Sequence, residues 1–334
     1  MKNTRLAIFV ITIILVNILA VSCKHKSGPL VGFMLPHMNG KRYSIERDVF
    51  TARVRELGAD VIFMSADNDE EKQIAQVNEI LSKDIDILVL DPVNRFRAEM
   101  VRAAHNVGIK VISYDRMIAN CDVDEFISFD ASAIGNQMTQ YALNKVPEGK
   151  YFILGGDKSD MNAVMIDNAL EKTLSPSIKS GKINIVYKTF IEKYSTDDAE
   201  YEMTRFLKFS QDAPDVVIAS TDKLALGALN AFKNFELEGK VLITGQDGEL
   251  FSCKNILKGY QAMTIYKPVK KMAKLAAELS IKMAKGENTD DYSKSKIFNG
   301  KEDIPSILLE VITVDATNLK NTIVADGMIS EAEL

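Results

Sequence analysis

Short apolar runs alternate with longer stretches of helical spacing along most of this chain. Runs of about four to eight apolar and β-branched residues predict buried strands, and apolar positions three or four residues apart predict helices. In the first part of the chain the predicted strands are 30–35, 60–64, 85–90 and 110–114, and the predicted helices are 45–57, 70–81 and 96–106. This alternation predicts a parallel sheet with helices on both faces.

After a further strand at 126–129 the same rhythm begins again. The predicted helices are 132–144, a helix ending at 174, 197–209, 223–232, 249–257 and 269–285, and the predicted strands are 151–154, 183–189, 215–219, 241–244 and 261–266. Without its first 22 residues the chain has roughly 310, more than one hydrophobic core supports. We therefore predict an α/β protein with two Rossmann-like lobes.

The restart also predicts how the chain divides between the lobes. We assign 30–130 plus 265–300 to the N-terminal lobe and 131–264 plus 301–330 to the C-terminal lobe. No low-complexity linker separates the halves, so the chain is expected to cross between lobes several times through short extended segments. Such crossovers form a hinge.

The N-terminus has the anatomy of an export signal. Lys2 and Arg5 precede an apolar run from 6 to 21 that is shorter than the roughly 20 residues of a membrane-spanning helix. We interpret 1–22 as a signal peptide that is removed on export. An uncleaved anchor helix is the alternative, and it would export the remaining chain as well.

The segment around Cys23 resembles a bacterial lipobox, although Ala20 stands where that motif usually has leucine. The resemblance implies that Cys23 is lipidated and that 23–29 is a short tether to a membrane. Cys121 and Cys253 remain; they lie on segments assigned to different lobes, so we expect two free, partly buried thiols.

The charge balance argues against a nucleic-acid partner. Without Lys2 and Arg5 the chain carries 39 basic and 46 acidic residues, a net charge of about −7. A DNA-binding regulator would also need a basic helix-turn-helix before the first strand, and residues 24–29 are too few for one.

Polar side chains gather where the predicted strands end, which is where open parallel sheets bind ligands. The positions are Arg42, Tyr43, Asp91, Asp115, Arg116, Asp130, Asp160, Asn162, Thr221, Asp222, Asp247 and Lys267. Carboxylates accept hydrogen bonds from sugar hydroxyls, and Arg and Asn donate them. Tyr43, Phe190 and Tyr194 are candidates to stack on the C–H face of a pyranose.

Each aspartate also has a structural interpretation, because the first residue of a helix after a strand is favoured as an N-cap. We interpret Asp222 as an N-cap only, and Asp91-Pro92 as a structural turn.

Six short strings, in order along the chain, are similar to the D-xylose-binding members of the bacterial periplasmic sugar-binding proteins. They lie at 113–118 (Ser-Tyr-Asp-Arg-Met-Ile), 127–130, 151–156, 245–247 (Gly-Gln-Asp), 263–268 and 299–306. The resemblance covers nearly the whole exported chain and implies the type I fold of the substrate-binding components of ABC transporters.

The resemblance also implies a site. Arg42, Asp115, Arg116, Asp160, Asn162, Asp247 and Lys267 fall where that family hydrogen-bonds its sugar. Tyr43 replaces a stacking tryptophan, a second tryptophan falls near Phe190 or Tyr194, and Thr221 replaces an asparagine. The sugar is expected to be D-xylose or a similar aldopentose.

By the same resemblance, the first lobe with Lys267 and the second lobe close on one sugar, with no cofactor. The protein is expected to be a periplasmic monomer whose closed form is read by an ABC permease or, alternatively, by a membrane sensor kinase.

An enzymatic role is disfavoured. Paired carboxylates can serve a glycosidase, but His25, His37 and His105 form no set with a nucleophile. Gly155-Gly156 lacks the rest of a phosphate-binding loop. The acidic run 67–71 lacks the glycine and glutamate spacing of a calcium loop, so no metal site is predicted.

Overall fold

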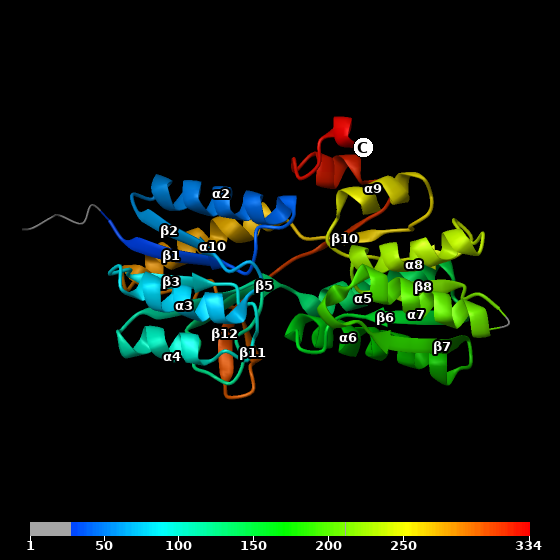
Figure 1. Cartoon of the computed structure of the whole chain (residues 1–334), viewed down its shortest axis with the longest axis horizontal. Coiled ribbons are helices and arrows are strands. Elements are labelled where there is room, and N and C mark those ends of the chain that lie inside the picture. The colour runs from blue at the N-terminus through cyan, green and yellow to red at the C-terminus, as the bar shows by residue number, and fades with distance from the viewer. Residues whose placement is uncertain (1–27, 211) are drawn as a thin grey trace, which may run out of the picture.

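The computed structural model describes residues 28–210 and 212–334. The predictions for the signal peptide 1–22 and for lipidation of Cys23 fall outside these residues. The described chain folds into two α/β lobes that lie side by side and are joined by several segments at the middle (Figure 1). The prediction of two lobes is confirmed.

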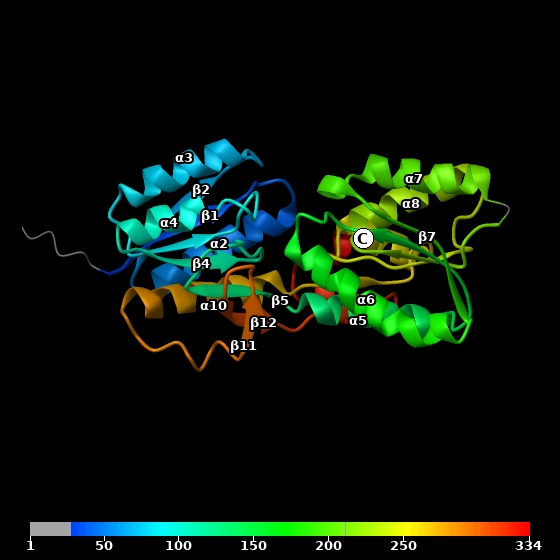
Figure 2. The same cartoon turned by 90° about the horizontal axis from the view of Figure 1, so that it is seen from below.

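The first lobe is built on a seven-stranded sheet in the order β11-β12-β5-β4-β3-β1-β2. Its strands are β1 (Leu30–Leu35), β2 (Asp60–Ser65), β3 (Ile87–Leu90), β4 (Lys110–Tyr114), β5 (Glu125–Phe129), β11 (Ser295–Phe298) and β12 (Asp303–Leu309). Every neighbouring pair is parallel except β11 with β12. The helices α3 (Glu70–Leu81) and α4 (Glu99–Asn106) cover one face, and α2 (Lys41–Glu56) and α10 (Val269–Ala284) cover the other (Figure 2).

Strand β1 shows why these runs form buried strands. Phe33 belongs to the core on the α2 face, where it stacks on Phe50 at a centroid distance of 4.0 Å, whereas its neighbour Met34 belongs to the core on the α3 face. Alternate side chains of a strand point to opposite faces, so a strand buried on both faces must be apolar throughout. Gly32 leaves room for α3, because a Cβ there would lie 2.9 Å from Ile80 Cδ1.

The second lobe has a four-stranded parallel sheet in the order β7-β6-β8-β9. Its strands are β6 (Gly149–Gly155), β7 (Ile183–Phe190), β8 (Val216–Ala219) and β9 (Leu242–Ile243). The helices α5 (Ala131–Lys145) and α6 (Met161–Lys179) cover one face, and α7 (Thr196–Phe209) and α8 (Asp222–Asn234) cover the other. A short antiparallel pair, β10 (Thr264–Tyr266) and β13 (Ile312–Val314), extends the sheet through a bridge between Gln246 and Ile265, and α9 (Leu250–Leu257) precedes β10.

Three segments of the described chain join the lobes, after β5, after β10 and after β12. The predicted boundary at 300 needs correction, because β12 pairs with β5 and therefore belongs to the first sheet; the third crossover lies near 310. The boundary at 265 also moves, because Ile265 and Tyr266 pair with β13 in the second lobe. Strands β11, β12 and β13 lie within 295–314, where the sequence pattern predicts no strand.

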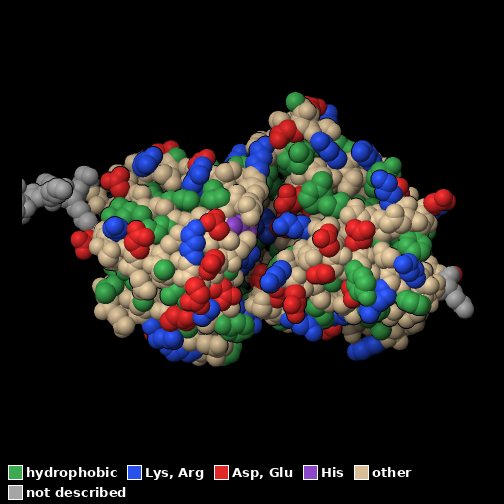
Figure 3. Space-filling view, in the orientation of Figure 1, with side chains coloured by type: hydrophobic (Ala, Val, Ile, Leu, Met, Phe, Trp, Pro, Cys, Tyr) green, Lys and Arg blue, Asp and Glu red, His purple; other side chains and the backbone are tan. Residues whose placement is uncertain are grey.

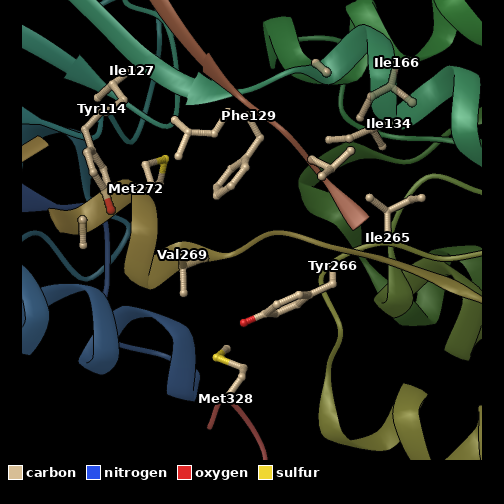
Figure 4. Packing of buried hydrophobic residues seen from close by; sticks show 14 of the residues in the cluster. Tyr114, Ile127, Phe129, Ile134, Ile166, Ile265, Tyr266, Val269, Met272 and Met328 are labelled. Atoms are coloured by element: carbon tan, nitrogen blue, oxygen red, sulfur yellow. The ribbon is translucent and has the colours of Figure 1, made fainter. Parts of the chain in front are cut away.

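The hinge region is packed as densely as a core. Phe129, Tyr266 and Val269 come from three different elements, and Figure 4 shows them gathered with Met328 around the crossing segments. The Tyr266 hydroxyl donates a hydrogen bond to the Asp326 carboxylate. The C-terminal residues, which include η2 (Lys320–Val324) and η3 (Glu331–Glu333), therefore cover the hinge.

Both described cysteines are free, as predicted, and they lie in different lobes. They are fully rather than partly buried, and burial raises the pKa of Cys121 to about 11 and that of Cys253 to about 12. None of the helices within 28–210 and 212–334 is both long and apolar enough to cross a membrane.

Glu125, at the start of β5, should make the stability of the fold depend on pH. It accepts a hydrogen bond from Ser293, and burial raises its pKa from 4.5 to about 7. The folded state therefore favours the protonated acid, and this stabilisation is present below pH 4.5 and is lost as the pH rises through about 7. Relative to Glu125→Gln, the wild-type free energy of unfolding should rise by up to ~3 kcal/mol as the pH falls across that range. Urea unfolding at several pH values measures this, with the exposed Glu148→Gln as control; a pH-independent difference would contradict it.

Candidate functional site

Polar side chains from both lobes meet at the carboxyl ends of the two sheets. We call this set the cleft site: Arg42, Tyr43, Asp115, Arg116, Asp160, Asn162, Tyr194, Thr221, Asp247 and Lys267. Figure 3 shows a hollow between the lobes that is bordered by basic and acidic side chains. Direct contacts cross it, since Asn162 Nδ2 donates to the Asp115 carbonyl oxygen at 2.9 Å.

Arg42 is the central cation of the first lobe. It lies in the first turn of α2, and its guanidinium donates to Glu46 Oε1, one helical turn later, at 3.0 Å and to Asp115 Oδ2 at 2.8 Å. Two carboxylates from different elements thus share one guanidinium, whose planar fork suits paired acceptors.

Asp115 is held by its backbone as well as by its side chain. Its φ of 60° is left-handed, a conformation that Asp tolerates better than most residues. Its N–H donates to Ile127 O at 2.8 Å, and Ser128 Oγ donates to its carbonyl oxygen at 2.8 Å. Burial alone would raise its pKa, but the charges of Arg42, Lys267 and Arg116 outweigh burial and lower the pKa to about 2. Asp115 is therefore an ionised acceptor.

Arg116 contacts the backbone of its own lobe and approaches the second lobe. Its Nη1 donates to the Pro92 carbonyl oxygen at 3.3 Å, and its Nε lies 3.9 Å from Asp160 Oδ2 in the other lobe. The second contact is long for a hydrogen bond. Arg116 therefore faces the gap between the lobes with donor capacity left over.

The loop after Arg116 is fixed by Asn299, from one of the strings shared with the resembling family. The buried Asn299 side chain donates to the carbonyl oxygens of Ile118 and Cys121 at 3.1 and 2.7 Å. Gly300 has a φ of 102°, and a Cβ there would lie 2.2 Å from Asn120 Oδ1. The Asn-Gly pair therefore serves to clamp the loop that carries Arg116.

In the second lobe, Asp160 is both a helix N-cap and a member of the cleft site. It is the N-cap of α6 and accepts from Asn162 N at 2.9 Å, while its other oxygen accepts from the Tyr194 hydroxyl at 2.8 Å. The cap orients one carboxylate oxygen along the helix and leaves the other toward Tyr194 and Arg116.

The remaining second-lobe groups surround Asp247, which follows β9. Lys267 Nζ lies 2.7 Å from Asp247 Oδ1, and this charge is the main influence that lowers the pKa of Asp247 against the opposing effect of burial. Lys267 lies on the crossover between β10 and α10 rather than within the first lobe. Its charge also lowers the pKa of Asp115, so it acts on one acid of each lobe.

The N-cap of α8 is Thr221 and not, as the sequence suggested, Asp222. Thr221 is the N-cap of α8, because its hydroxyl accepts from Leu224 N at 3.3 Å. Asp222 is buried and accepts hydrogen bonds from Gln261 Nε2 at 3.0 Å and Thr264 Oγ1 at 3.1 Å, so it ties α8 to β10. The interpretation of Asp222 as an N-cap was wrong; burial and Asp247 raise its pKa to about 7.

Asp115 and Asp247 occupy matching positions in the two lobes. Asp247 also has a positive φ, 107°, and donates its N–H to the neighbouring strand residue Ile265 at 2.9 Å, as Asp115 does to Ile127. Strained backbone of this kind is concentrated at functional sites. The two lobes therefore present one carboxylate each by the same local geometry.

The aromatic candidates separate into two groups. Tyr43 lies beside the Arg42 guanidinium, 5.5 Å from its ring centroid, and Tyr194 binds Asp160, so both border the cleft site. Phe190 instead packs beneath Lys158, with Nζ 3.9 Å from the ring centroid, and beside Lys188. The structure brings Tyr194, and not Phe190, to the polar groups of the cleft site.

Four residues around the cleft site were not predicted to belong to it: His37, Glu46, Asp91 and Tyr114. The His37 ring lies 4.2 Å from that of Tyr43; burial and then the charges of Arg116, Lys223 and Arg42 lower its pKa to about 4. Glu46 could have been found from its spacing of four residues from Arg42. Asp91 is among the polar strand-end positions of the sequence, but its Asp-Pro context was interpreted as a structural turn.

The cleft site is suited to a neutral ligand rich in hydroxyl groups. Its cations are bonded to, or lie close to, carboxylates of the protein, so it offers donors and acceptors without a large excess of one charge. Within the described part of the chain, no group of three His, Cys, Asp or Glu side chains could hold a metal ion.

Comparisons with known proteins agree with this architecture. Residues 31–288 match the family model of the periplasmic binding protein domain. The chain is 35% identical over 324 residues to the D-xylose-binding periplasmic protein of Escherichia coli, covering 97% of this chain and 96% of that protein. It is 27% identical to the multiple sugar-binding periplasmic receptor ChvE of Rhizobium radiobacter, covering 89% and 90% of the two chains.

A solved structure shows the same fold. An ABC transporter solute-binding protein from Clostridium phytofermentans with bound β-D-glucose superposes with a TM-score of 0.83 at 26% identity, covering 91% of this chain and 99% of that one. The predicted fold class, two lobes of the type I periplasmic binding protein, is confirmed.

The charge network predicts the effect of removing Arg42. In Arg42→Met, Asp115 stays buried but loses its main cationic partner, so its pKa should rise from about 2 toward or above 3.8. The variant should also unfold more readily, because two buried carboxylates lose their partner. Side-chain ¹³C NMR titration measures the pKa. Arg55→Met, on the same helix but exposed, is the control; an unchanged Asp115 titration would contradict the network.

Proposed function

This chain belongs to the periplasmic binding protein family, and on that basis we propose that it binds one monosaccharide between its lobes and presents it to a membrane ABC permease. The protein would hold the sugar without chemical change. The observation that carries this proposal is the convergence of Asp115, Arg116, Asp160, Asp247 and Lys267 from both lobes and the hinge on one small cleft.

Hydrogen bonding explains how such a site would recognise a sugar. Ionised Asp115 and Asp247 accept from hydroxyls, while Arg116 and Asn162 donate to hydroxyl or ring oxygens. Tyr43 and Tyr194 border the site and can cover the apolar C–H faces of a pyranose. A ligand that carries several hydroxyls in a fixed arrangement satisfies these groups together.

We propose D-xylose, or a similar aldopentose, as the sugar. The D-xylose-binding proteins of Escherichia coli and Haemophilus influenzae are each 35% identical to this chain. Tyr43 stands where the resembling family has a stacking tryptophan, so the faces offered to the ring differ.

Closure of the lobes provides the mechanism. Asn162 reaches the Asp115 carbonyl oxygen and Arg116 approaches Asp160 only because the sheet edges face each other. A sugar between these edges would touch both lobes and favour the closed form over an open one. The permease would then recognise surfaces of both lobes at once.

The identity of the ligand can be tested by calorimetry and thermal shift with pentoses, hexoses and amino acids. D-xylose should bind and raise the melting temperature with concentration, because ligand that binds only the folded form adds RT ln(1 + [L]/Kd) to stability. The recovered sugar should be unchanged. Stabilisation by amino acids alone would contradict sugar binding, and stabilisation by hexoses alone would contradict the pentose assignment.

Arg116 offers a sharper test of the site. In Arg116→Ala, charged hydrogen bonds to the sugar are lost in a desolvated cleft, so binding should weaken by about 2–4 kcal/mol, roughly 30-fold to nearly a thousandfold. The matched control is Arg55→Ala, on an exposed part of α2, which should bind normally. An unchanged Kd in Arg116→Ala, measured with the best sugar, would remove this residue from the site.

A further inference from the structure

A cluster of buried polar side chains, Glu46, Asp91 and Tyr114, lies next to the cleft site. Asp91 follows β3, one position beyond the Leu90–Ser113 pair, and therefore lies beside Tyr114 at the edge of the sheet. Glu46 approaches from α2, and all three residues are 0% exposed. Elsewhere this layer between sheet and helix is filled by apolar side chains such as Phe33 and Phe50.

The Asp91 side chain points toward the cleft site. Val89, two residues earlier in the strand, belongs to the core on the α2 face, and side chains two apart in a strand share a face. Arg116 Nη1 bonds the carbonyl oxygen of Pro92, the next residue, so the guanidinium lies beside Asp91. Among the neighbouring acids, Asp91 has the largest effect on the pKa of Arg116, which it raises.

Four polar atoms of this cluster lack partners. Neither carboxylate oxygen of Asp91 has a hydrogen-bond partner among the described residues, and the same is true of Glu46 Oε2 and the Tyr114 hydroxyl. Burial raises the pKa of Asp91 well above its ordinary value, against the opposing charge of Arg116. A buried acceptor without a donor destabilises a fold, so such a group in a binding cleft points to a donor supplied by the ligand.

We propose that Asp91 is a further ligand-binding residue of the cleft site, which accepts a hydrogen bond from one sugar hydroxyl directed toward α2. The inference rests on the proposed function and deepens it. A site built to bond a hydroxyl rejects analogues that lack it, because the buried acceptor is then left unpaired. Asp91 therefore sets specificity at one position of the sugar ring.

The test is a double-mutant cycle between protein and ligand. The best-binding sugar and its monodeoxy analogues are titrated into wild type and Asp91→Leu by calorimetry. Wild type should reject one analogue by at least about 30-fold, and Asp91→Leu should reduce that one discrimination to within about threefold while keeping the others. Without ligand, Asp91→Leu should melt at a higher temperature than wild type, because an unpaired buried acid has been replaced by hydrocarbon.

Each outcome bears on a different claim. If no monosaccharide binds wild type, the proposed function itself fails. If wild type binds but Asp91→Leu weakens every analogue equally, or none, Asp91 has no contact with one hydroxyl and the inference is overturned. Asp60→Leu, at the opposite end of the sheet, should leave every affinity unchanged. If Asp91→Leu does not fold, Asp91→Ala replaces it, because alanine also lacks a side-chain acceptor; undiminished discrimination there also overturns the inference.

Discussion

The bond between Arg42 and Asp115 is the interaction on which the arrangement of the cleft depends. At the edge of the first sheet, Glu46, Asp91 and Asp115 are buried close to one another, and such a group of acids is unstable without a cation among them. The guanidinium of Arg42 bonds two of the three, and Arg116 lies beside the third. The first lobe can therefore keep several carboxylate acceptors at the buried edge of its sheet.

Lys267 extends the same balance across the hinge. It bonds Asp247 in the second lobe and comes from the crossover that leads into α10 of the first. Motion of the hinge therefore changes the distance between this cation and Asp115. The charge balance of the cleft therefore depends on how far the lobes are closed. This suits a site that is completed by closure.

The sequence was most informative where one physical rule acts alone. Strands buried on both faces must be apolar, so β1, β3 and β4 were found with little error. The edge strand β11 alternates exposed and half-buried residues and β12 contains Pro305, so neither resembles a buried strand, and the third crossover was misplaced. Pattern could not decide between Phe190 and Tyr194, because the turn between them contains left-handed Lys193 and Tyr194. The pattern alone gave Asp91 the interpretation of a structural turn, because Asp-Pro is common in turns; its burial and its unpaired oxygens are visible only in the structure.

The clamp made by Asn299 has a consequence for the order of events during binding. Its side chain holds both ends of the short loop after Arg116, so that loop gains no order when a ligand arrives. Tyr194 and Asn162, by contrast, belong to the lobe that must approach. A preordered surface loses less conformational entropy on association. We therefore expect the sugar to bind the first lobe before the second. Capture would then proceed by encounter with the first lobe, followed by closure of the second, and the rate at which the lobes reopen would govern how long the sugar is retained.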